Sequence, residues 1–143
     1  HEHGPQGGDE LNRIEAGANY GWPIVTEGVD YNGARITPFD DHEARGFTAP
    51  VLGWTPSIAP SGLLAYQGDR FADWTGDLFV TALAGQALHH IDLDAAGNVV
   101  SQNRILLEGR PRLRQVAEGP DGALWVLTDA EDGRILRLSP ADD

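Results

Sequence analysis

The sequence lacks cysteine, methionine and lysine entirely, and all ten of its basic residues are arginine. Without cysteine there is no disulfide framework, no thiolate nucleophile and no cysteine-based zinc site. The 22 acidic residues bring the formal net charge to −12, which disfavours binding to the phosphates of nucleic acids and of anionic membranes. No apolar run approaches the roughly 18 residues of a membrane-spanning helix. We therefore expect neither nucleic acid nor a membrane as a partner.

Glycine, by contrast, is abundant. The 143 residues include 18 glycines, about twice the usual share, which is typical of turn-rich β-structure. Apolar residues make up 41% and charged residues 22% of the chain, as in globular proteins, and the length suffices for one domain with a buried core. These proportions favour an all-β fold over a helical bundle or a disordered chain.

A weak internal repeat indicates how that fold is built. Residues 76–80 return as residues 122–126, 46 positions later, and residues 91–94 have a counterpart in residues 136–139. A period of about 40 to 50 residues, with short strands and glycine-containing turns, is typical of propeller blades. The same pattern predicts strands over 78–83, 87–93, 104–107, 123–128 and 134–138, with chain reversals over 95–98, 119–122 and 131–133.

The first 60 residues differ from the rest. Residues 20–59 are rich in glycine, proline, aspartate and aromatic residues without a sustained period, and only residues 9–14 have a faint helical pattern. Long ordered loops are more often functional than structural. We interpret residues 1–60 as one loop-rich blade and residues 61–143 as two further blades of a single domain.

The familiar catalytic signatures are missing from the sequence. It has no Gly-x-Ser-x-Gly elbow, no phosphate-binding glycine loop and no His-Glu-x-x-His helix. Arg112 and Arg114 are the most informative side chains of the second half, because residues i and i+2 of a strand share a face. Two guanidiniums on one face can clamp an anion that carries carboxylates. A surface salt bridge is the alternative in so acidic a chain.

Residues 3–12 and 17–23 resemble the signature of the PQQ-dependent sugar dehydrogenases, the quinoproteins that include soluble glucose dehydrogenase and aldose sugar dehydrogenase. The resemblance continues through residues 59–62, 74–83, 112–114 and 119–122. It implies the C-terminal part of a six-bladed β-propeller of the quinoprotein glucose dehydrogenase type, with about three blades in this chain. It also implies hydride transfer from C1 of an aldose to calcium-bound pyrroloquinoline quinone (PQQ), which gives a lactone.

The same resemblance implies two calcium sites. Gly4 and Pro5 match the positions whose main-chain carbonyls hold the catalytic calcium. Asp9, Glu10 and Tyr20 match a second, structural site, where the glutamate contributes carboxylate oxygen and the tyrosine its main-chain carbonyl. Such oxygens suit calcium, a hard ion that takes six to eight of them. On their own, Gly4-Pro5 indicates only a turn and the acidic pair only a solvated surface.

The resemblance also implies which side chains contact the cofactor. His3 matches a side chain beside the quinone, and Ser57 matches a hydroxyl that hydrogen-bonds it. Arg112 and Arg114 match the arginines that bind its carboxylates. Ala84 departs from the family, which commonly has a lysine at this position. The catalytic histidine base lies upstream in the family, so we expect no catalytic residue here and a fragment of a larger, periplasmic or secreted protein.

Three functions stay open at this point. The chain belongs to a sugar dehydrogenase that uses an aldose and an external electron acceptor, to a calcium-stabilised propeller that binds without catalysis, or to a propeller lactonase. The paired arginines favour the first function, and Ala84 favours the second. Because three blades leave sheet edges exposed, we expect another chain or a second copy to complete the propeller.

Overall fold

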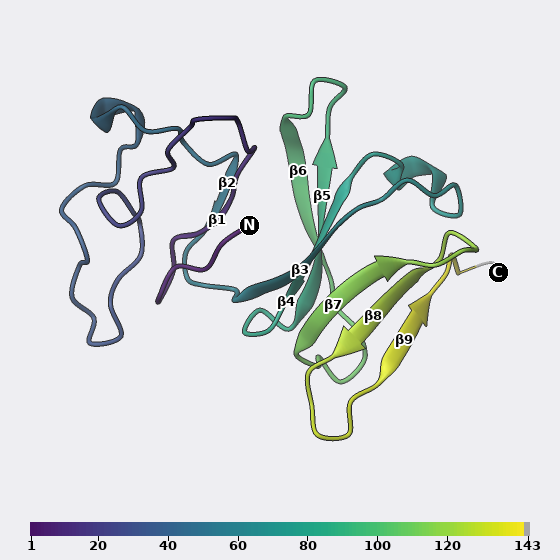
Figure 1. Ribbon diagram of the computed structural model, residues 1–143. Coiled ribbons are helices and arrows are strands. Elements are labelled where there is room, and N and C mark those ends of the chain that lie inside the picture. Colours follow the sequence, from purple (N-terminus) through teal and green to yellow (C-terminus); the bar gives the residue numbers. More distant parts are fainter. Residues whose placement is uncertain (142–143) are drawn as a thin grey trace. The chain divides into compact units, whose positions relative to one another are not determined.

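The computed structural model describes residues 1–141, which contain nine β-strands and two 3-10 helices of three residues each (Figure 1). The all-β class expected from the composition is therefore confirmed. Neither helix in this part of the chain has the length and apolar character needed to span a bilayer. The chain divides into two compact units, His1–Pro60 and the part that begins at Ser61, and each is described by itself.

The first unit consists mostly of loops around one short pair of strands. Strand β1 (Asp9–Leu11) runs antiparallel to β2 (Leu52–Trp54), with Asp9 opposite Trp54, and the connection between them contains the 3-10 helix η1 (Glu43–Arg45). Glu2 extends the pair, since its main chain exchanges two hydrogen bonds with Glu10 at 2.9 and 3.0 Å. The faint helical pattern over residues 9–14 was therefore misleading, because tertiary pairing on both sides of β1 outweighs a weak local preference.

The second unit begins with a four-stranded sheet in the order β3 (Pro60–Ala65), β4 (Leu78–Ala82), β5 (Ala87–Leu93) and β6 (Val99–Ile105). The short 3-10 helix η2 (Ala72–Trp74) lies between β3 and β4. The strands expected over 78–83 and 87–93 are confirmed. Strand β6 begins earlier than expected, because the Asp94 carboxylate accepts the main-chain N–H groups of Ala96 and Asn98 and so ends the preceding turn before Val99.

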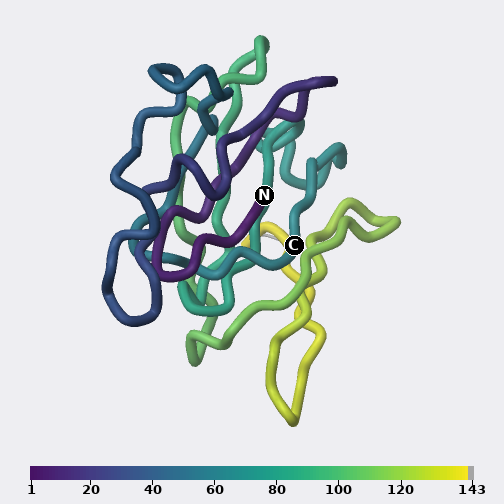
Figure 2. The backbone as a smooth tube through the Cα atoms, turned by 60° about the vertical axis from the view of Figure 1, so that its left-hand side comes forward, coloured from purple at the N-terminus to yellow at the C-terminus, as the bar shows by residue number. Residues whose placement is uncertain are grey.

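The remaining strands form a three-stranded sheet in the order β7 (Leu113–Glu118), β8 (Leu124–Thr128) and β9 (Ile135–Leu138). Figure 2 shows the β8–β9 hairpin as a narrow loop toward the yellow end of the tube. Burial alternates along β8, where Leu124, Val126 and Thr128 are buried. One face of this sheet thus joins the core of the unit, which contains Tyr66, Phe79, Leu88, Leu113, Val116, Leu124 and Val126.

Buried polar side chains tie this core together. The fully buried Tyr66 hydroxyl donates to the carbonyl of Gly122 at 2.7 Å and accepts the N–H of Phe71 at 3.1 Å. His90 contacts Asp77 at 2.6 Å. His89 is also buried, and burial, reinforced by the charge of a nearby arginine, lowers its pKa to about 4. Both neighbouring histidines therefore lie inside, whereas strict alternation along β5 would expose one of them.

Candidate functional site

The loop that carries Gly4 and Pro5 is a tight glycine-rich turn in the first unit. Gly4 is buried, and a Cβ atom at this position would collide with the carbonyl oxygen of Gly7 and the main chain of Gly8. Gly7 and Gly8 have φ angles of 106° and 67°, in the region that favours glycine. The Gly4 N–H donates to the carboxylate of Asp9 at 2.8 Å. The turn is therefore fixed from inside by the first residue of β1.

Asp9 joins that turn to the segment after β2. Its side chain is fully buried, and its oxygen Oδ2 accepts hydrogen bonds from the Ser57 hydroxyl at 2.8 Å, the Ile58 N–H at 2.7 Å and the Ala59 N–H at 3.1 Å. Oδ1 accepts the Gly4 N–H and lies 3.0 Å from the Ser57 hydroxyl. Donors thus surround both oxygens, which is the environment of a carboxylate that fixes the main chain. The expectation that Asp9 binds calcium stays a prediction.

Glu10, the next residue, is a buried carboxylate with an incomplete set of partners. It is 7% exposed, and its Oε1 lies 3.5 Å from Nε2 of His42. Asn12 donates a long hydrogen bond of 3.4 Å to its Oε2 and a shorter one of 2.7 Å to Glu2. Burial raises the pKa of Glu10, and this effect exceeds the opposing influence of Asn12 and His42. A cation beside Glu10 would offset the free-energy cost of burying the charged carboxylate.

The surroundings of Glu10 supply further oxygen ligands. The side-chain oxygen Oδ1 of Asn12 is buried without a hydrogen-bond partner, and a small cavity is lined by Glu2, Glu10 and Tyr20 among others. Residues 1–141 contain no group of three or more histidine, aspartate or glutamate side chains that could hold a metal. A cation here would therefore need amide and main-chain oxygens beside Glu10, a ligand set that calcium accepts.

Three residues expected near the cofactor or metal make hydrogen bonds to other residues of the first unit. His3 hydrogen-bonds through Nε2 to the carbonyl of Pro60. The Tyr20 hydroxyl donates to the carbonyl of Arg13 at 2.6 Å. The Ser57 hydroxyl proton is used by Asp9. The expected contacts of these residues with quinone or calcium stay predictions.

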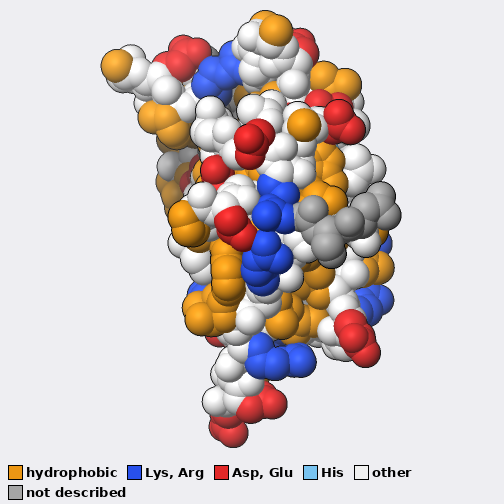
Figure 3. All heavy atoms as spheres, turned by 90° about the vertical axis from the view of Figure 1, so that its right-hand side faces the viewer, with side chains coloured by type: hydrophobic (Ala, Val, Ile, Leu, Met, Phe, Trp, Pro, Cys, Tyr) orange, Lys and Arg blue, Asp and Glu red, His pale blue; other side chains and the backbone are white. Residues whose placement is uncertain are grey.

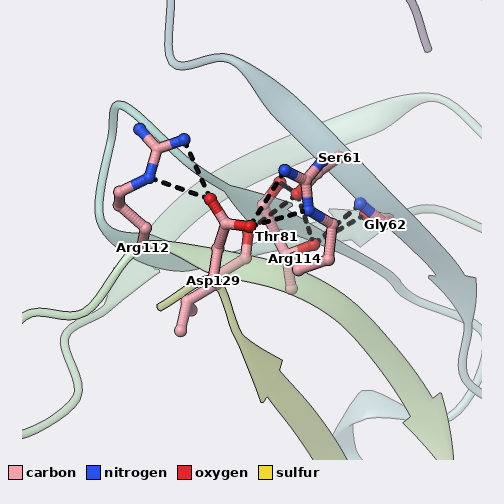
Figure 4. Close-up of polar contacts among 7 residues, drawn as sticks. Ser61, Gly62, Thr81, Arg112, Arg114 and Asp129 are labelled. Carbon is pink, nitrogen blue, oxygen red and sulfur yellow. Dashed lines mark hydrogen bonds and ion pairs between the residues drawn. The ribbon is translucent and has the colours of Figure 1, made fainter. Parts of the chain in front are cut away.

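Arg112 and Arg114 meet on a single carboxylate in the second unit. Oδ2 of Asp129 accepts from Nε of Arg112 at 3.0 Å and lies 3.0 Å from Nη2 of the same arginine. Oδ1 accepts from Nε and Nη2 of Arg114 at 3.2 and 3.0 Å. Figure 4 shows the Asp129 carboxylate between the two guanidiniums, one on each side. The two arginines do lie together, as the i, i+2 spacing predicts.

The main chain beneath the two arginines is held at several points. Leu113, between them, is fully buried, and its carbonyl accepts the Ser61 hydroxyl at 2.8 Å. The N–H of Asp129 donates to the carbonyl of Arg112 at 2.8 Å. The register between β7 and β8 shifts between Leu113 and Gln115, so Arg114 occupies an irregularity of the strand. Such a bulge re-aims a side chain, and here it accompanies the convergence of both guanidiniums on Asp129.

Asp129 is the residue that the sequence analysis missed. It follows β8 directly, and the N-terminal end of β7 pairs with the C-terminal end of β8, where Leu113 lies opposite Thr128. An acidic residue one position beyond a predicted strand, facing an Arg-x-Arg motif on its neighbour, was the available signal. The two arginines lower the pKa of Asp129, with the larger effect from Arg114. Asp129 therefore stays charged near neutral pH.

Charges of both signs are mixed on the surface around this unit. In the face shown in Figure 3, arginine side chains lie among aspartate and glutamate side chains. Arg112 and Arg114 are about half exposed, with side-chain fractions of 49% and 50%. Ala84, where the family commonly has lysine, lies in the turn between β4 and β5. Two arginines that share one carboxylate carry a net charge of about +1.

Comparison with known proteins places the chain among sugar dehydrogenases. A sequence profile of the glucose/sorbosone dehydrogenase family matches residues 1–137. The aldose sugar dehydrogenase YliI of Escherichia coli K12 is 41% identical over 140 residues, which cover 97% of this chain and 37% of YliI.

Two solved structures are similar over nearly the whole chain. A crystal structure of glucose dehydrogenase has a TM-score of 0.90 and 42% identity, covering 99% of this chain and 40% of that one. The PQQ-bound aldose sugar dehydrogenase of Streptomyces coelicolor has a TM-score of 0.66 and 31% identity, covering 95% of this chain and 37% of that one. The chain thus spans well under half the length of these relatives.

The comparisons also confirm the expected fold, that of the β-propeller of quinoprotein glucose dehydrogenases. Because the profile match covers almost every residue, the assignment does not depend on one motif. The chain belongs to the glucose/sorbosone dehydrogenase family.

Proposed function

We propose that the protein oxidises the C1 hydroxyl of aldose sugars to lactones with PQQ and calcium, and that this chain holds the cofactor. The observation that carries the proposal is the convergence of Arg112 and Arg114 on Asp129. Supporting it, one relative is named an aldose sugar dehydrogenase, and a structural neighbour is described as PQQ-bound. Because the family resemblance implies that the histidine base lies upstream of the matched motifs, the proposal assigns no catalytic base to these 143 residues.

The second unit supplies the carboxylate clamp in this proposal. PQQ carries three carboxylates, and a guanidinium binds a carboxylate through two parallel N–H donors. Arg112 and Arg114 would fix the position of the cofactor and neutralise part of its charge. Bound PQQ supplies the hydride acceptor for C1 of the sugar.

The first unit supplies oxygen ligands for calcium. The carbonyls of Gly4 and Pro5 would hold the catalytic ion, and Asp9 keeps their turn in place through the Gly4 N–H. Glu10 and the main-chain carbonyl of Tyr20 would hold a second ion. The buried, unpartnered oxygen of Asn12 and the raised pKa of Glu10 fit a cation at this second site. We assign Asp9 an anchoring role, because N–H and O–H donors already surround both its oxygens.

A calcium-stabilised propeller that binds without catalysis is the second candidate. Ala84 favours it, because the position that commonly carries a lysine in the family offers no donor here. Gln86, in the same turn, has a φ of 49° and is the nearest neutral donor in sequence. This candidate predicts PQQ binding without turnover.

One experiment separates these candidates. The protein as it occurs, with any sequence that flanks these 143 residues, is stripped with a chelator and titrated with PQQ and CaCl2, and reduction of a dye is followed with glucose and other aldoses. The proposal expects saturable, calcium-dependent PQQ binding and dye reduction that depends on the aldose. Binding without dye reduction supports the binding module, and absence of PQQ binding contradicts both.

We also propose that the protein is periplasmic or secreted and that it passes its electrons to an external acceptor. Both follow from the family resemblance. Fractionation of the source cells tests the location, and recovery of the protein in the cytoplasmic fraction contradicts it.

A further inference from the structure

We propose that Asp129 is a positioning residue that holds Arg112 and Arg114 by one edge of each guanidinium and leaves their other donors for the carboxylates of the cofactor. This inference rests on the proposed function, and it assigns a role to a residue outside the motifs that the sequence analysis singled out. It gives these half-exposed salt bridges a second role, as part of a prepared binding site.

The hydrogen-bond pattern supports this division of labour. All recorded contacts with Asp129 use Nε and Nη2, which lie on one edge of the planar guanidinium. A guanidinium has five N–H donors, so the two donors on Nη1 and one on Nη2 are left over on each arginine. Each oxygen of Asp129 serves one arginine, so neither arginine competes with the other for the same oxygen. The pair can therefore present a second edge to another anion without losing its hold on Asp129.

The main chain that carries Arg112 and Arg114 is held by several contacts. Leu113 anchors the segment in the core, Ser61 holds its carbonyl, and the Asp129 N–H closes a main-chain hydrogen bond to Arg112. The side chain of Asp129 is 29% exposed, less than either guanidinium. The side chains of Arg112 and Arg114 thus start from a main chain that is held in place, and the Asp129 carboxylate lies between them (Figure 4). A ligand would not have to order two long side chains before binding.

The charges of the three side chains also support a binding site for an anion. Two neighbouring guanidiniums repel each other, and a single carboxylate between them offsets that repulsion while a net positive charge of about one remains. A second carboxylate at this position would cancel the attraction for an anion. The pKa of Asp129 is lowered, so the arrangement persists through the neutral range.

Asp121 provides a matched comparison within the same unit. It precedes β8, whereas Asp129 follows it, so the two carboxylates lie at opposite ends of the strand. Asp121 also serves two arginines, with Arg137 at 2.6 Å and Arg70 at 4.0 Å, but both contacts fall on the same oxygen, Oδ2. Arg70 and Arg137 are not part of an Arg-x-Arg motif. Asp121→Asn therefore removes the same charge and the same kind of ion pair away from the proposed clamp.

The test compares PQQ affinity in four variants of the protein as it occurs, loaded with calcium and titrated with PQQ. Asp129→Asn should weaken PQQ binding about tenfold, which corresponds to about 1.4 kcal/mol, because both guanidiniums lose their fixed orientation. Asp129→Glu, which keeps the carboxylate, should recover most of the affinity. Asp121→Asn should leave it unchanged. Arg112→Lys, which keeps charge but not the fork, should weaken binding at least as much as Asp129→Asn.

Several results separate the two claims. If Arg112→Lys weakens binding and Asp129→Asn does not, or strengthens it, the positioning role is wrong and the clamp stands. If neither variant changes the PQQ affinity, the clamp itself is wrong, and with it the inference. A loss shared equally by Asp129→Asn and Asp121→Asn is not specific to the arginine pair, because losing a negative charge should by itself favour an anion, and it also overturns the inference. The KM for the aldose serves as a further readout, and the positioning role leaves it unchanged once PQQ is saturating.

Discussion

The most demanding prediction concerns Asp9, whose buried carboxylate joins two segments nearly 50 residues apart. In Asp9→Asn, one oxygen becomes an NH2 group that must face a donor. If the amide replaces Oδ2, the N–H groups of Ile58 and Ala59 lose their acceptor; if it replaces Oδ1, the Gly4 N–H does. In both orientations the remaining hydrogen bonds also lose the strength that a charged acceptor gives.

The size of the effect follows from these contacts. An unsatisfied buried donor costs about 1–3 kcal/mol, and hydrogen bonds to a charged group contribute about 1.5–3 kcal/mol each. We expect Asp9→Asn to lower the free energy of unfolding by about 3 kcal/mol, since at least one buried N–H is orphaned and others are weakened. For a chain of this length that corresponds to a fall in Tm of about 10 °C.

Urea unfolding and hydrogen exchange together test this. Asp41→Asn is the control, because Asp41 is an exposed aspartate of the same unit that accepts one hydrogen bond, from the Ala44 N–H at 3.0 Å. The control should lose less than about 1 kcal/mol. The exchange of the Ile58 and Ala59 amides should quicken in Asp9→Asn only. The reasoning is refuted if the two variants lose equal stability, or if these amides keep their protection.

Four further predictions follow from other contacts. Gly4→Ala should cost about 1–3 kcal/mol in urea unfolding, because its Cβ meets the Gly7 carbonyl, and an unchanged midpoint contradicts the tight turn. Tyr66→Phe should cost about 1–3 kcal/mol, because the Gly122 carbonyl loses its buried donor, and a loss below about 0.5 kcal/mol speaks against that bond. The pKa of His89 is about 4 in the folded protein and about 6.5 in the unfolded chain, so between these pH values the unfolded state binds more protons. The difference in free energy of unfolding between the protein and His89→Gln should therefore shrink as the pH falls from 6.5 to 4. A difference that stays constant contradicts the buried neutral histidine. The 143-residue chain alone should sediment above the 15.4 kDa of one copy, because β9 is the edge of a three-stranded sheet with Ile135 69% exposed, and a monomer contradicts the expected association.

Much of the second unit could be predicted from its sequence, and the reason is local. Strands β4, β5, β8 and β9 are apolar runs that end at turns of glycine, asparagine or aspartate, so pattern and turn chemistry agree. Strand β3 was missed because Pro60 and Gly62 usually interrupt strands. Extended structure was assumed at Arg112 and Arg114, but the rest of β7 was missed because its arginine and glutamine disguise the alternation. Proline is nonetheless tolerated as the first residue of a strand.

The candidate site could be predicted only in part. The sequence singled out Gly4, Arg112 and Arg114 as candidates, but not the contacts that Asp9 and Asp129 make with them. The donors around Asp9 come from Gly4 and from residues 57–59, and the second of these contacts joins distant segments, which no local pattern shows. Asp129 was missed for the same reason, since its pairing depends on the register between β7 and β8.

The central claim is that Arg112 and Arg114, held by Asp129, bind the carboxylates of the cofactor. The most direct test is a crystal structure of the protein as it occurs, soaked with PQQ and CaCl2. The account predicts a guanidinium of each arginine within hydrogen-bond distance of a PQQ carboxylate, with Asp129 still on its other edge. PQQ bound elsewhere, or both arginines engaged with Asp129 alone, would contradict it.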